Sequence, residues 1–331
     1  MSERLVDDYD AVFFDLDGVV YLGDVAVPGS VEAMSALAMT DVRVMYVTNN
    51  AARKAQTVVD HLLELGFHAT LENVLTSAQV AVRFLAEDLP KGAKILVSGT
   101  QDLVDLIAAQ GFVPVESADD QPLAVIQGYD PQMTWPRLDE AVLAIQRGAR
   151  WYATNSDASR PTERGLVPGA GAAIDVVAAV VGGQPTIFGK PFLPMLVEAI
   201  RRTGAQRPLF VGDRIDTDIV GAANAGIDSL MVLTGAHGKA DLVAARPGER
   251  PTHIGSDLGA LLEAARGVDL TRDRARVGSE VAEARGGEIA LLSSPEDRSS
   301  QVDALWAIAQ LSWARPDLDV AAALERLDQV Q

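Results

Sequence analysis

The feature that most constrains this chain is a short apolar run that stops abruptly at two carboxylates. Residues Ala11–Phe14 are all apolar, and Asp15 and Asp17 follow, with Gly18 next. A run without polar alternation is typical of a parallel strand buried on both faces. Asp15 and Asp17 are two residues apart, so an extended chain points them to the same side, and Gly18 allows a sharp turn beyond them. We therefore expect two acids at the carboxyl end of a buried strand, where open α/β sheets bind their ligands.

The charge of these two acids must be balanced, and the motif alone leaves three interpretations open. Two ionised carboxylates about 4 Å apart repel each other by roughly 4 kcal/mol at an effective dielectric of about 20. A hard cation such as Mg²⁺ between the oxygens would offset this repulsion, or one acid could keep its proton and serve as a general acid. The third interpretation is an ordinary Asp-Gly turn that closes a strand.

Composition restricts the partners and the kinds of site. The chain has 331 residues, 48% of them apolar, so it can bury a sizeable core in two or more domains. Its formal charge of −18 argues against a nucleic-acid partner, which needs a basic surface. An anionic small substrate would then need a locally positive site built from metal, lysine and backbone amides. The absence of cysteine excludes disulfides, thiolate zinc sites and cysteine nucleophiles.

Neither a targeting segment nor a membrane span is expected. Every apolar run is shorter than the roughly 18 residues that a membrane span needs. The first residues, Met-Ser-Glu-Arg-Leu-Val-Asp-Asp, are too acidic for a signal peptide. We therefore expect a cytoplasmic protein.

A second apolar strand, expected at residues 42–47, also ends in small polar groups. Thr48 and Asn49 follow it directly, ahead of a helix expected at 53–65. Hydroxyl, amide and free N–H groups at a helix start can form a cradle for an oxyanion. The same residues can instead be an ordinary helix cap that binds nothing, so this segment keeps both interpretations.

Further polar groups follow later strands. Lys190 lies in a Gly-Lys-Pro loop, and Asp213 lies at the tip of a strand expected at 208–211. Asp218 lies where the next helix, expected at 219–225, begins. Because the carboxyl ends of parallel strands share one edge of a sheet, we expect these groups to converge with the first two acids. That convergence favours a functional site over a set of separate structural turns.

Alternating strands and helices predict an α/β protein with a Rossmann-like parallel-sheet core. Strands between residues 83 and 184 carry less polar chemistry at their ends, so we interpret 83–184 as a second α/β domain inserted into the first. The first domain then comprises residues 1–82 and 185–265, and its last helix is expected at 257–265.

Residues 266–331 are expected to form a small C-terminal extension domain. It begins with a linker rich in charge and continues with an amphipathic helix at 302–311 and another helix at 320–330. The charged residues of the linker are Asp269, Arg272, Asp273, Arg274 and Arg276.

Four motifs closely resemble those of the haloacid dehalogenase superfamily of phosphatases, in particular its NagD-like or 4-nitrophenylphosphatase-like branch. The motifs are Asp15-Leu16-Asp17-Gly18-Val19, Thr48-Asn49-Asn50, Gly189-Lys190-Pro191 and Gly212-Asp213-Arg214-Ile215-Asp216-Thr217-Asp218. Residues 153–157, 161–163 and 168–171 resemble the cap domain of that branch. The resemblance covers about residues 8–263 and implies a haloacid dehalogenase core with an inserted α/β cap.

The position of the inserted domain supports the same branch. Thirty residues, 18–47, separate Asp17 from Thr48, which is too few for a domain, while more than a hundred lie between Asn50 and Lys190. Mutase-like members of the superfamily usually carry their cap in the earlier position. The late insertion therefore favours a phosphatase.

The resemblance implies a role for each acid. Asp15 would be the nucleophile that takes the phosphoryl group as an aspartyl phosphate, and also a Mg²⁺ ligand. Asp17 would protonate the leaving alkoxide and then activate the hydrolytic water, while its backbone carbonyl binds the metal. Asp213 would complete the Mg²⁺ site, and Asp218 would support it through water. Phosphate-monoester hydrolysis can need rate gains of up to about 10²¹, which no single carboxylate supplies.

The resemblance also implies a set of phosphate-binding groups. Thr48 and Asn49 would hold the transferring phosphoryl oxygens, and Lys190 would neutralise Asp15 and the phosphate. Residues of the cap would contact the leaving group and so determine the substrate. Candidates for that task, each of which could equally be structural, are Gly128-Tyr129-Asp130, Asn155 and Arg160.

The C-terminal extension resembles that of bacterial glycerol-3-phosphate phosphatases. We therefore expect a small phosphorylated metabolite as substrate, with glycerol 3-phosphate first and 2-phosphoglycolate or pyridoxal phosphate as alternatives. A catalytically idle regulatory or binding protein is the alternative of another class, and the intact Asp15, Asp17, Lys190 and Asp213 argue against it. We interpret the extension as a packing or oligomerisation surface, which leaves a homo-oligomer open.

Overall fold

The computed structural model describes residues 3–162 and 164–330. It falls into two compact units, of which the first comprises residues 1–45, 65–67 and 203–331 and the second residues 46–64 and 68–202. Glu163, part of the cap motif expected at 161–163, lies outside the described residues.

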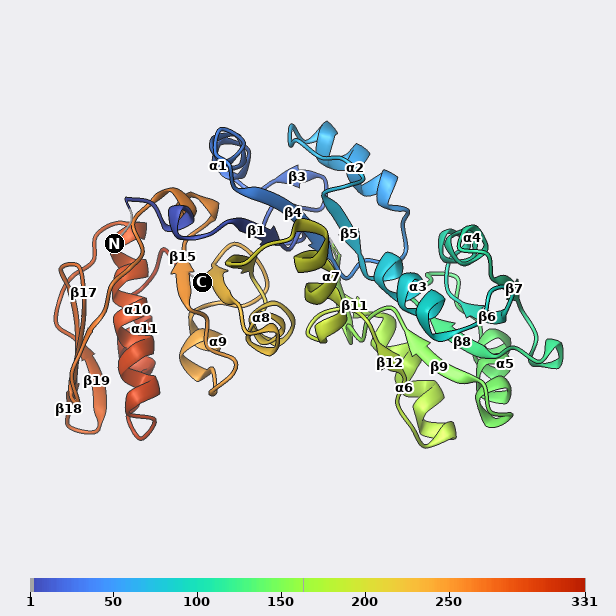
Figure 1. Cartoon of the computed structure of the whole chain (residues 1–331). Helices are drawn as coiled ribbons and strands as arrows, with labels where there is room; N and C mark the ends of the chain where they lie inside the picture. The colour runs from blue at the N-terminus through green and yellow to red at the C-terminus, as the bar shows by residue number, and fades with distance from the viewer. Residues whose placement is uncertain (1–2, 163, 331) are drawn as a thin grey trace. The chain divides into compact units, whose positions relative to one another are not determined.

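The core is a six-stranded parallel sheet with the strand order β15-β14-β13-β1-β4-β5 (Figure 1). Strand β4 (Arg43–Thr48) begins in the first unit and continues into the second. Strands β1 (Ala11–Phe14) and β13 (Pro208–Gly212) are buried along their whole length, as expected for parallel strands covered on both faces. The predicted α/β fold class and the first strand are therefore confirmed.

The other elements of the first unit's core are short. They are the 3-10 helix η1 (Leu5–Asp8), β2 (Tyr21–Leu22), β3 (Val25–Ala26), α1 (Ser30–Leu37), the π-helical turn η3 (Ile215–Ile219), α8 (Val220–Ala225), β14 (Asp228–Val232), α9 (Lys239–Ala244), β15 (His253–Gly255) and the 3-10 helix η4 (Leu258–Leu262). The prediction of a helix at 257–265 is wrong, because only the 3-10 helix η4 forms there. Asp257 caps its start at the Gly259 N–H, and the Glu263 carbonyl accepts from the Leu5 N–H instead of continuing a helix.

The second unit contains a separate five-stranded parallel sheet with the order β12-β9-β8-β6-β7. Apolar residues of α5 and α6 pack against it and form its core. The elements of this unit are α2 (Ala55–Glu64), β5 (Val74–Thr76), α3 (Ser77–Asp88), β6 (Lys94–Ser98), α4 (Gln101–Ala109), β7 (Val113–Val115), η2 (Ala118–Asp120), β8 (Ala124–Gln127), α5 (Trp135–Gln146), β9 (Arg150–Ala153), β10 (Ser159–Thr162), β11 (Gly165–Pro168), α6 (Ala170–Val181), β12 (Thr186–Ile187) and α7 (Leu193–Thr203).

A buried ion-pair network ties α7 to α3 in the second unit. The Glu198 carboxylate, 1% exposed, accepts from Arg201 and Arg202 on its own helix and from Arg83 on α3. Burial raises the pKa of Glu198. Hydrogen bonds from Arg201 and Arg202 and the charge of Arg83 outweigh burial, and they lower the pKa from 4.5 to about 2.

Glu198→Gln is expected to destabilise the protein in a pH-dependent way. Because the folded-state pKa is lowered, the carboxylate stabilises the fold above about pH 4.5 and loses this contribution as the pH falls toward 2. The full contribution corresponds to about 3 kcal/mol. Urea unfolding should show a loss of that order at neutral pH and a smaller loss near pH 3.5. The exposed Glu64→Gln is the matched control, and an equal loss at both pH values would contradict the assignment.

The C-terminal extension contains an antiparallel sheet where a charged linker was expected. Its strands, in spatial order, are β16 (Asp269–Leu270), β17 (Arg274–Val277), β18 (Glu280–Arg285) and β19 (Glu288–Leu291). The prediction of a charge-rich linker is therefore wrong, because residues 269–277 contain β16 and β17. In β17 the exposed Arg274 and Arg276 alternate with the buried Ala275 and Val277, which is the pattern of a half-buried strand.

The helix expected at 302–311 is longer and more deeply buried than predicted. Helix α10 (Arg298–Ala314) lies between the C-terminal sheet and α9 (Figure 1). Apolar residues of α10, of the sheet and of the core around α9 and β15 belong to one hydrophobic cluster. The amphipathic interpretation is therefore wrong, because both sides of the helix meet apolar partners.

The last expected helix, 320–330, is also shorter. Only α11 (Ala321–Glu325) forms. Beyond it, the Arg326 guanidinium donates to the carbonyls of Leu291 and Ser293, and the Leu327 carbonyl accepts from Lys239. These contacts draw the chain away from a helical path.

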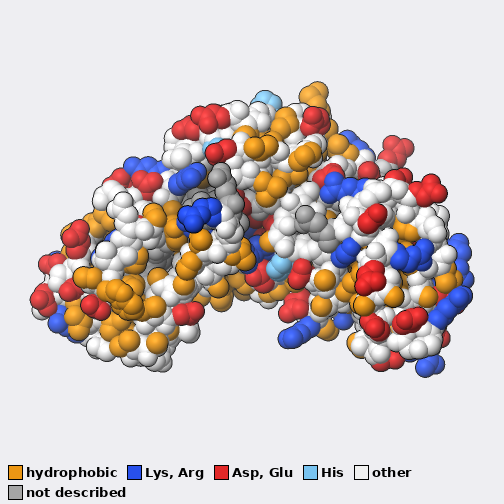
Figure 2. Space-filling view, turned by 180° about the vertical axis from the view of Figure 1, so that it is seen from behind, with side chains coloured by type: hydrophobic (Ala, Val, Ile, Leu, Met, Phe, Trp, Pro, Cys, Tyr) orange, Lys and Arg blue, Asp and Glu red, His pale blue; other side chains and the backbone are white. Residues whose placement is uncertain are grey.

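Charged side chains of both signs are interspersed over the C-terminal part, on the right of the face seen in Figure 2. This is the expected surface for a half-buried antiparallel sheet that faces water. Within the described part of the chain, no helix is both long enough and apolar enough to cross a membrane.

Candidate active site

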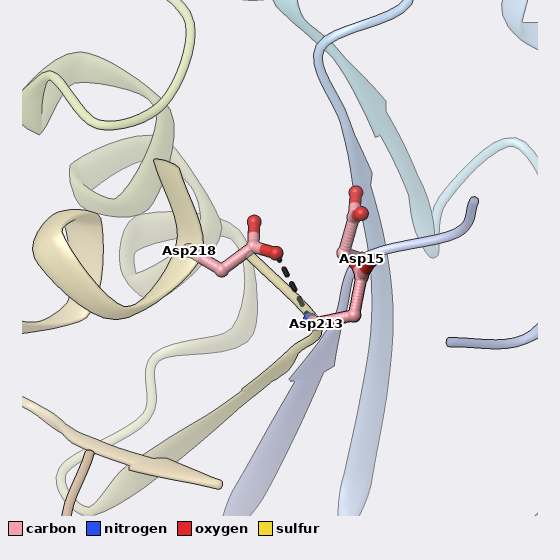
Figure 3. Close-up of side chains that lie close together, drawn as sticks. All are labelled: Asp15, Asp213 and Asp218. Carbon is pink, nitrogen blue, oxygen red and sulfur yellow. Dashed lines mark hydrogen bonds between the residues drawn. The ribbon is translucent and has the colours of Figure 1, made fainter. Parts of the chain in front are cut away.

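Three buried carboxylates come together where β1 and β13 end. Asp15 follows β1 and Asp213 follows β13, and these strands are parallel neighbours, with Phe14 opposite Val211. Asp218 comes from the turn η3. One ligand oxygen of each carboxylate lies within 4.8 Å of the other two (Figure 3). The exposed fractions of Asp15, Asp213 and Asp218, hereafter the triad, are 8%, 1% and 0%.

Backbone N–H groups orient Asp218. Its Oδ2 accepts from the N–H of Asp213 at 3.2 Å, the bond drawn in Figure 3, and from that of Arg214 at 3.1 Å. A Cβ at Gly212 would lie 2.2 Å from the Asp218 Cβ, so only glycine permits this approach. Burial opposes ionisation of the neighbouring Asp216, but hydrogen bonds and charge from Arg214 outweigh it and lower the pKa of that carboxyl.

The second acid of the first motif lies outside the triad. The Asp17 side chain is exposed, whereas the triad carboxylates are buried. Gly18 follows it with φ +90°, and its N–H donates to the Tyr21 carbonyl at 2.8 Å, which closes the turn. A Cβ at Gly18 would lie 2.5 Å from Asp213 Oδ2. Glycine is therefore required both by the backbone conformation and by the close approach to Asp213.

A segment after β14 that was not among the predicted site residues contacts the triad. The Ala236 N–H donates to Asp213 Oδ2 at 2.6 Å, and the Thr234 hydroxyl donates to the Gly18 carbonyl at 2.5 Å. A Cβ at Gly235 would lie 1.9 Å from Asp213 Oδ2, so this position also needs glycine. A Thr-Gly pair one residue beyond a buried strand, at the sheet edge that carries the acids, is the signal that would have identified the segment.

The triad suits a hard divalent cation. Three buried carboxylates at this separation repel one another when they are charged, and a cation bound between them would offset that repulsion. An all-oxygen set of carboxylates is what Mg²⁺ binds. Of the three interpretations of the first motif, the metal site is therefore the one that the geometry favours.

A second cluster lies in the second unit, where β4 ends. Asn49 is bound on both sides to the Gly-Lys-Pro loop: its Oδ1 accepts from the Lys190 N–H at 2.8 Å, and its Nδ2 donates to the Lys190 carbonyl at 3.0 Å. Lys190 itself is 2% exposed. The buried Thr48 accepts from the Asn50 N–H at 3.1 Å. Because α2 begins only at Ala55, the interpretation of Thr48 and Asn49 as a helix cap is wrong.

Asn155 contacts the same asparagine. Its Nδ2 donates to the Asn49 carbonyl at 2.7 Å, and its Oδ1 accepts from the Asp157 N–H at 3.1 Å. A Cβ at Gly189 would lie 2.7 Å from Asn49 Oδ1. The glycine at this position therefore allows the Gly-Lys-Pro loop to approach Asn49 closely. The described residues thus bring Asp15, Asp213 and Asp218 together in the first unit, and Thr48, Asn49, Lys190 and Asn155 together in the second.

Of the other cap candidates, Asp130 has a structural role, whereas Arg160 is exposed. Asp130 forms an ion pair with Arg137 at 2.5 Å, and Arg137 also donates to the Gly99 carbonyl, so this carboxylate fixes the local fold. Arg160, which is exposed, lies over the Tyr129 ring at 4.8 Å. Such cation–π contact holds a guanidinium in place while leaving its N–H donors available.

Two family profiles match the chain. The haloacid dehalogenase-like hydrolase profile matches residues 12–113, and the HAD-hydrolase-like profile matches residues 187–261. The first matched segment carries Asp15, and the second carries Lys190, Asp213 and Asp218.

Individual phosphatases are also similar to this chain in sequence and in fold. The chain is 45% identical over 259 residues to a D-glycerol 3-phosphate phosphatase from Mycobacterium tuberculosis, covering 78% of this chain and 72% of that one. A crystal structure of glycerol phosphate phosphatase from the same organism, in complex with magnesium, aligns with a TM-score of 0.87 and 38% identity over 99% of both chains. A 4-nitrophenylphosphatase from Thermotoga maritima aligns with a TM-score of 0.74 and 31% identity over 79% of this chain and 99% of that one.

Proposed function

Because this chain belongs to the haloacid dehalogenase superfamily, in its NagD-like and 4-nitrophenylphosphatase-like branch, we propose that it is a Mg²⁺-dependent glycerol-3-phosphate phosphatase. The buried triad of Asp15, Asp213 and Asp218 carries the proposal for the chemistry. The likeness over 99% of the chain to a glycerol phosphate phosphatase, C-terminal extension included, supports the substrate. The 4-nitrophenylphosphatase covers only 79% of the chain.

The proposed reaction has two steps, both carried by the first motif. First, an Asp15 oxygen attacks phosphorus, the bond from phosphorus to the ester oxygen breaks, and Asp17 gives its proton to the leaving alkoxide. Then Asp17 takes a proton from water, the water oxygen attacks phosphorus, and the bond to Asp15 breaks. The products are glycerol and phosphate, and both acids return to their starting states.

The triad and the Asp17 carbonyl are the proposed metal site. Asp15 and Asp213 would bind Mg²⁺ through carboxylate oxygens, Asp17 through its backbone carbonyl, and Asp218 through water. Bound Mg²⁺ supplies positive charge to the phosphoryl oxygens and to the nucleophile. Backbone donors already hold the Asp213 and Asp218 carboxylates in fixed orientations, which supports this assignment.

Groups of the second cluster are the proposed phosphate-binding residues. Lys190 would add positive charge beside the transferring phosphoryl group, and Thr48 would donate a hydroxyl hydrogen bond to it. Both ends of the Asn49 side chain bind the Lys190 backbone, so we assign phosphate contact to the Asn49 main-chain N–H and loop positioning to its side chain. Asn155 would support Asn49 from the cap.

We propose the domain division of a catalytic core at 1–82 and 185–265, a cap at 83–184 and an extension at 266–331. The proposed partner is a small phosphorylated metabolite in the cytoplasm, and the formal charge of −18 supports a protein that binds no nucleic acid. The extension is the surface through which a homo-oligomer would form.

A substrate panel tests the proposed function. Phosphate release should be fastest in kcat/KM with glycerol 3-phosphate, slower with 2-phosphoglycolate and pyridoxal phosphate, and lost when Mg²⁺ is removed by a chelator and restored when it is returned. A preference of more than about tenfold for either alternative would replace the substrate but keep the chemistry. No release from any ester, with Mg²⁺ bound, would favour the catalytically idle alternative.

A further inference from the structure

The turn η3 carries the triad residue Asp218, and its first backbone N–H groups cannot be satisfied by the turn's own hydrogen bonds. The Arg214 N–H is taken by Asp218 Oδ2 at 3.1 Å. The next N–H, that of Ile215, donates to the Nδ1 atom of His237 at 2.8 Å. Because a backbone N–H can only donate, Nδ1 is the acceptor and the ring proton is on Nε2.

The same residue also holds Asp213. The His237 N–H donates to the Asp213 carbonyl at 3.3 Å, next to the bond from the Ala236 N–H to the Asp213 carboxylate. One short segment therefore fixes Asp213 and the start of the turn that carries Asp218. Ile215 is only 6% exposed, so its N–H would be buried without a partner if the ring were removed. The turn would then have to shift to satisfy it.

We propose that His237 is a positioning residue for the Mg²⁺ site, an inference that rests on the proposed function. Its ring sets the position of Asp218 relative to Asp213 and acts on the metal only through these two carboxylates. Removing a group that orients metal ligands typically costs 10–100-fold in metal affinity. The loss should therefore appear in Mg²⁺ binding and not in the chemistry of the metal-loaded enzyme.

The test measures the Mg²⁺ dissociation constant of the full chain by isothermal titration calorimetry, without substrate. His237→Ala should raise this Kd by about 10–100-fold. In His237→Asn, the side-chain oxygen stands where Nδ1 was, so the Kd should return to within about threefold of wild type. In His237→Gln the acceptor lies one bond farther out, so the Kd should stay high. At saturating Mg²⁺, kcat of all three variants should remain within about threefold of wild type.

The exposed His68, changed to Ala and to Asn, provides matched controls whose Mg²⁺ Kd should not move. An unchanged Kd in folded His237→Ala, an Asn variant as weak as the Ala variant, or a loss confined to kcat at saturating Mg²⁺ would each overturn the proposal. If His237→Ala does not fold, the comparison of Asn with Gln decides in the same way. A wild type that binds Mg²⁺ but releases no phosphate would sink the proposed function and leave this test intact.

Discussion

Asp15→Asn is expected to lower kcat/KM for glycerol 3-phosphate by at least about 10⁴-fold. The amide has no negative charge, so it attacks phosphorus poorly and forms no aspartyl phosphate. It also removes one of the three buried carboxylates that lie within 4.8 Å of each other, so Mg²⁺ binding should weaken as well. Phosphate release at saturating Mg²⁺ is the measurement, with rapid quenching to detect phosphate bound to the wild-type chain.

The control for this prediction is Asp139→Asn, an exposed carboxylate on α5 that lies outside the triad. It should retain wild-type kcat/KM. Thermal unfolding of both variants separates a chemical loss from a folding loss. An Asp15→Asn enzyme that retained more than about one tenth of wild-type activity while folded would mean that another group is the nucleophile.

Asp17→Asn is expected to slow turnover of glycerol 3-phosphate by about 10²–10⁴-fold, the usual contribution of general acid–base catalysis. The Asp17 side chain is exposed and lies outside the triad, and the backbone carbonyl assigned to the metal is unchanged by the substitution. The Mg²⁺ Kd should therefore stay close to wild type. This separates the role of Asp17 from that of Asp15, whose replacement should affect both quantities.

The choice of ester sharpens the Asp17 prediction. 4-Nitrophenolate leaves without being protonated, so the first step should survive in Asp17→Asn while attack by water remains slow. The variant should release about one equivalent of 4-nitrophenolate per chain in a burst and then turn over slowly. Steady wild-type turnover of both esters would remove Asp17 from the mechanism. Absence of both burst and turnover would place its role before phosphoryl transfer.

The triad could be predicted because each of its residues is marked in the sequence. A run of four apolar residues ending at Asp15, and another ending next to Asp213, indicate parallel strands whose ends meet at one edge. The role of Asn49 could not be predicted in the same way. A polar residue after a strand has the same appearance whether its side chain binds substrate or, as found, binds the Lys190 backbone on both sides.

The segment after β14 and the C-terminal sheet were missed for different physical reasons. Ala236 contributes a backbone N–H, a group that every residue except proline has, so its identity carries no signal. Strand β17 alternates arginines with small apolar residues. Its many charges suggested a linker, and only Ala275 and Val277 show the period of two that is typical of a strand. In both cases the residue types are ordinary, and their structural role is visible only from the residues that they contact in the fold.

The burial of α10 on both sides makes the C-terminal extension a structural part of the first unit. Leu242 of α9 and Ile254 of β15 belong to the same apolar cluster as Leu305 and Ile308 of α10. Deletion of the extension is therefore expected to expose this apolar surface and to leave a chain prone to aggregate, which light scattering of the truncated protein would detect.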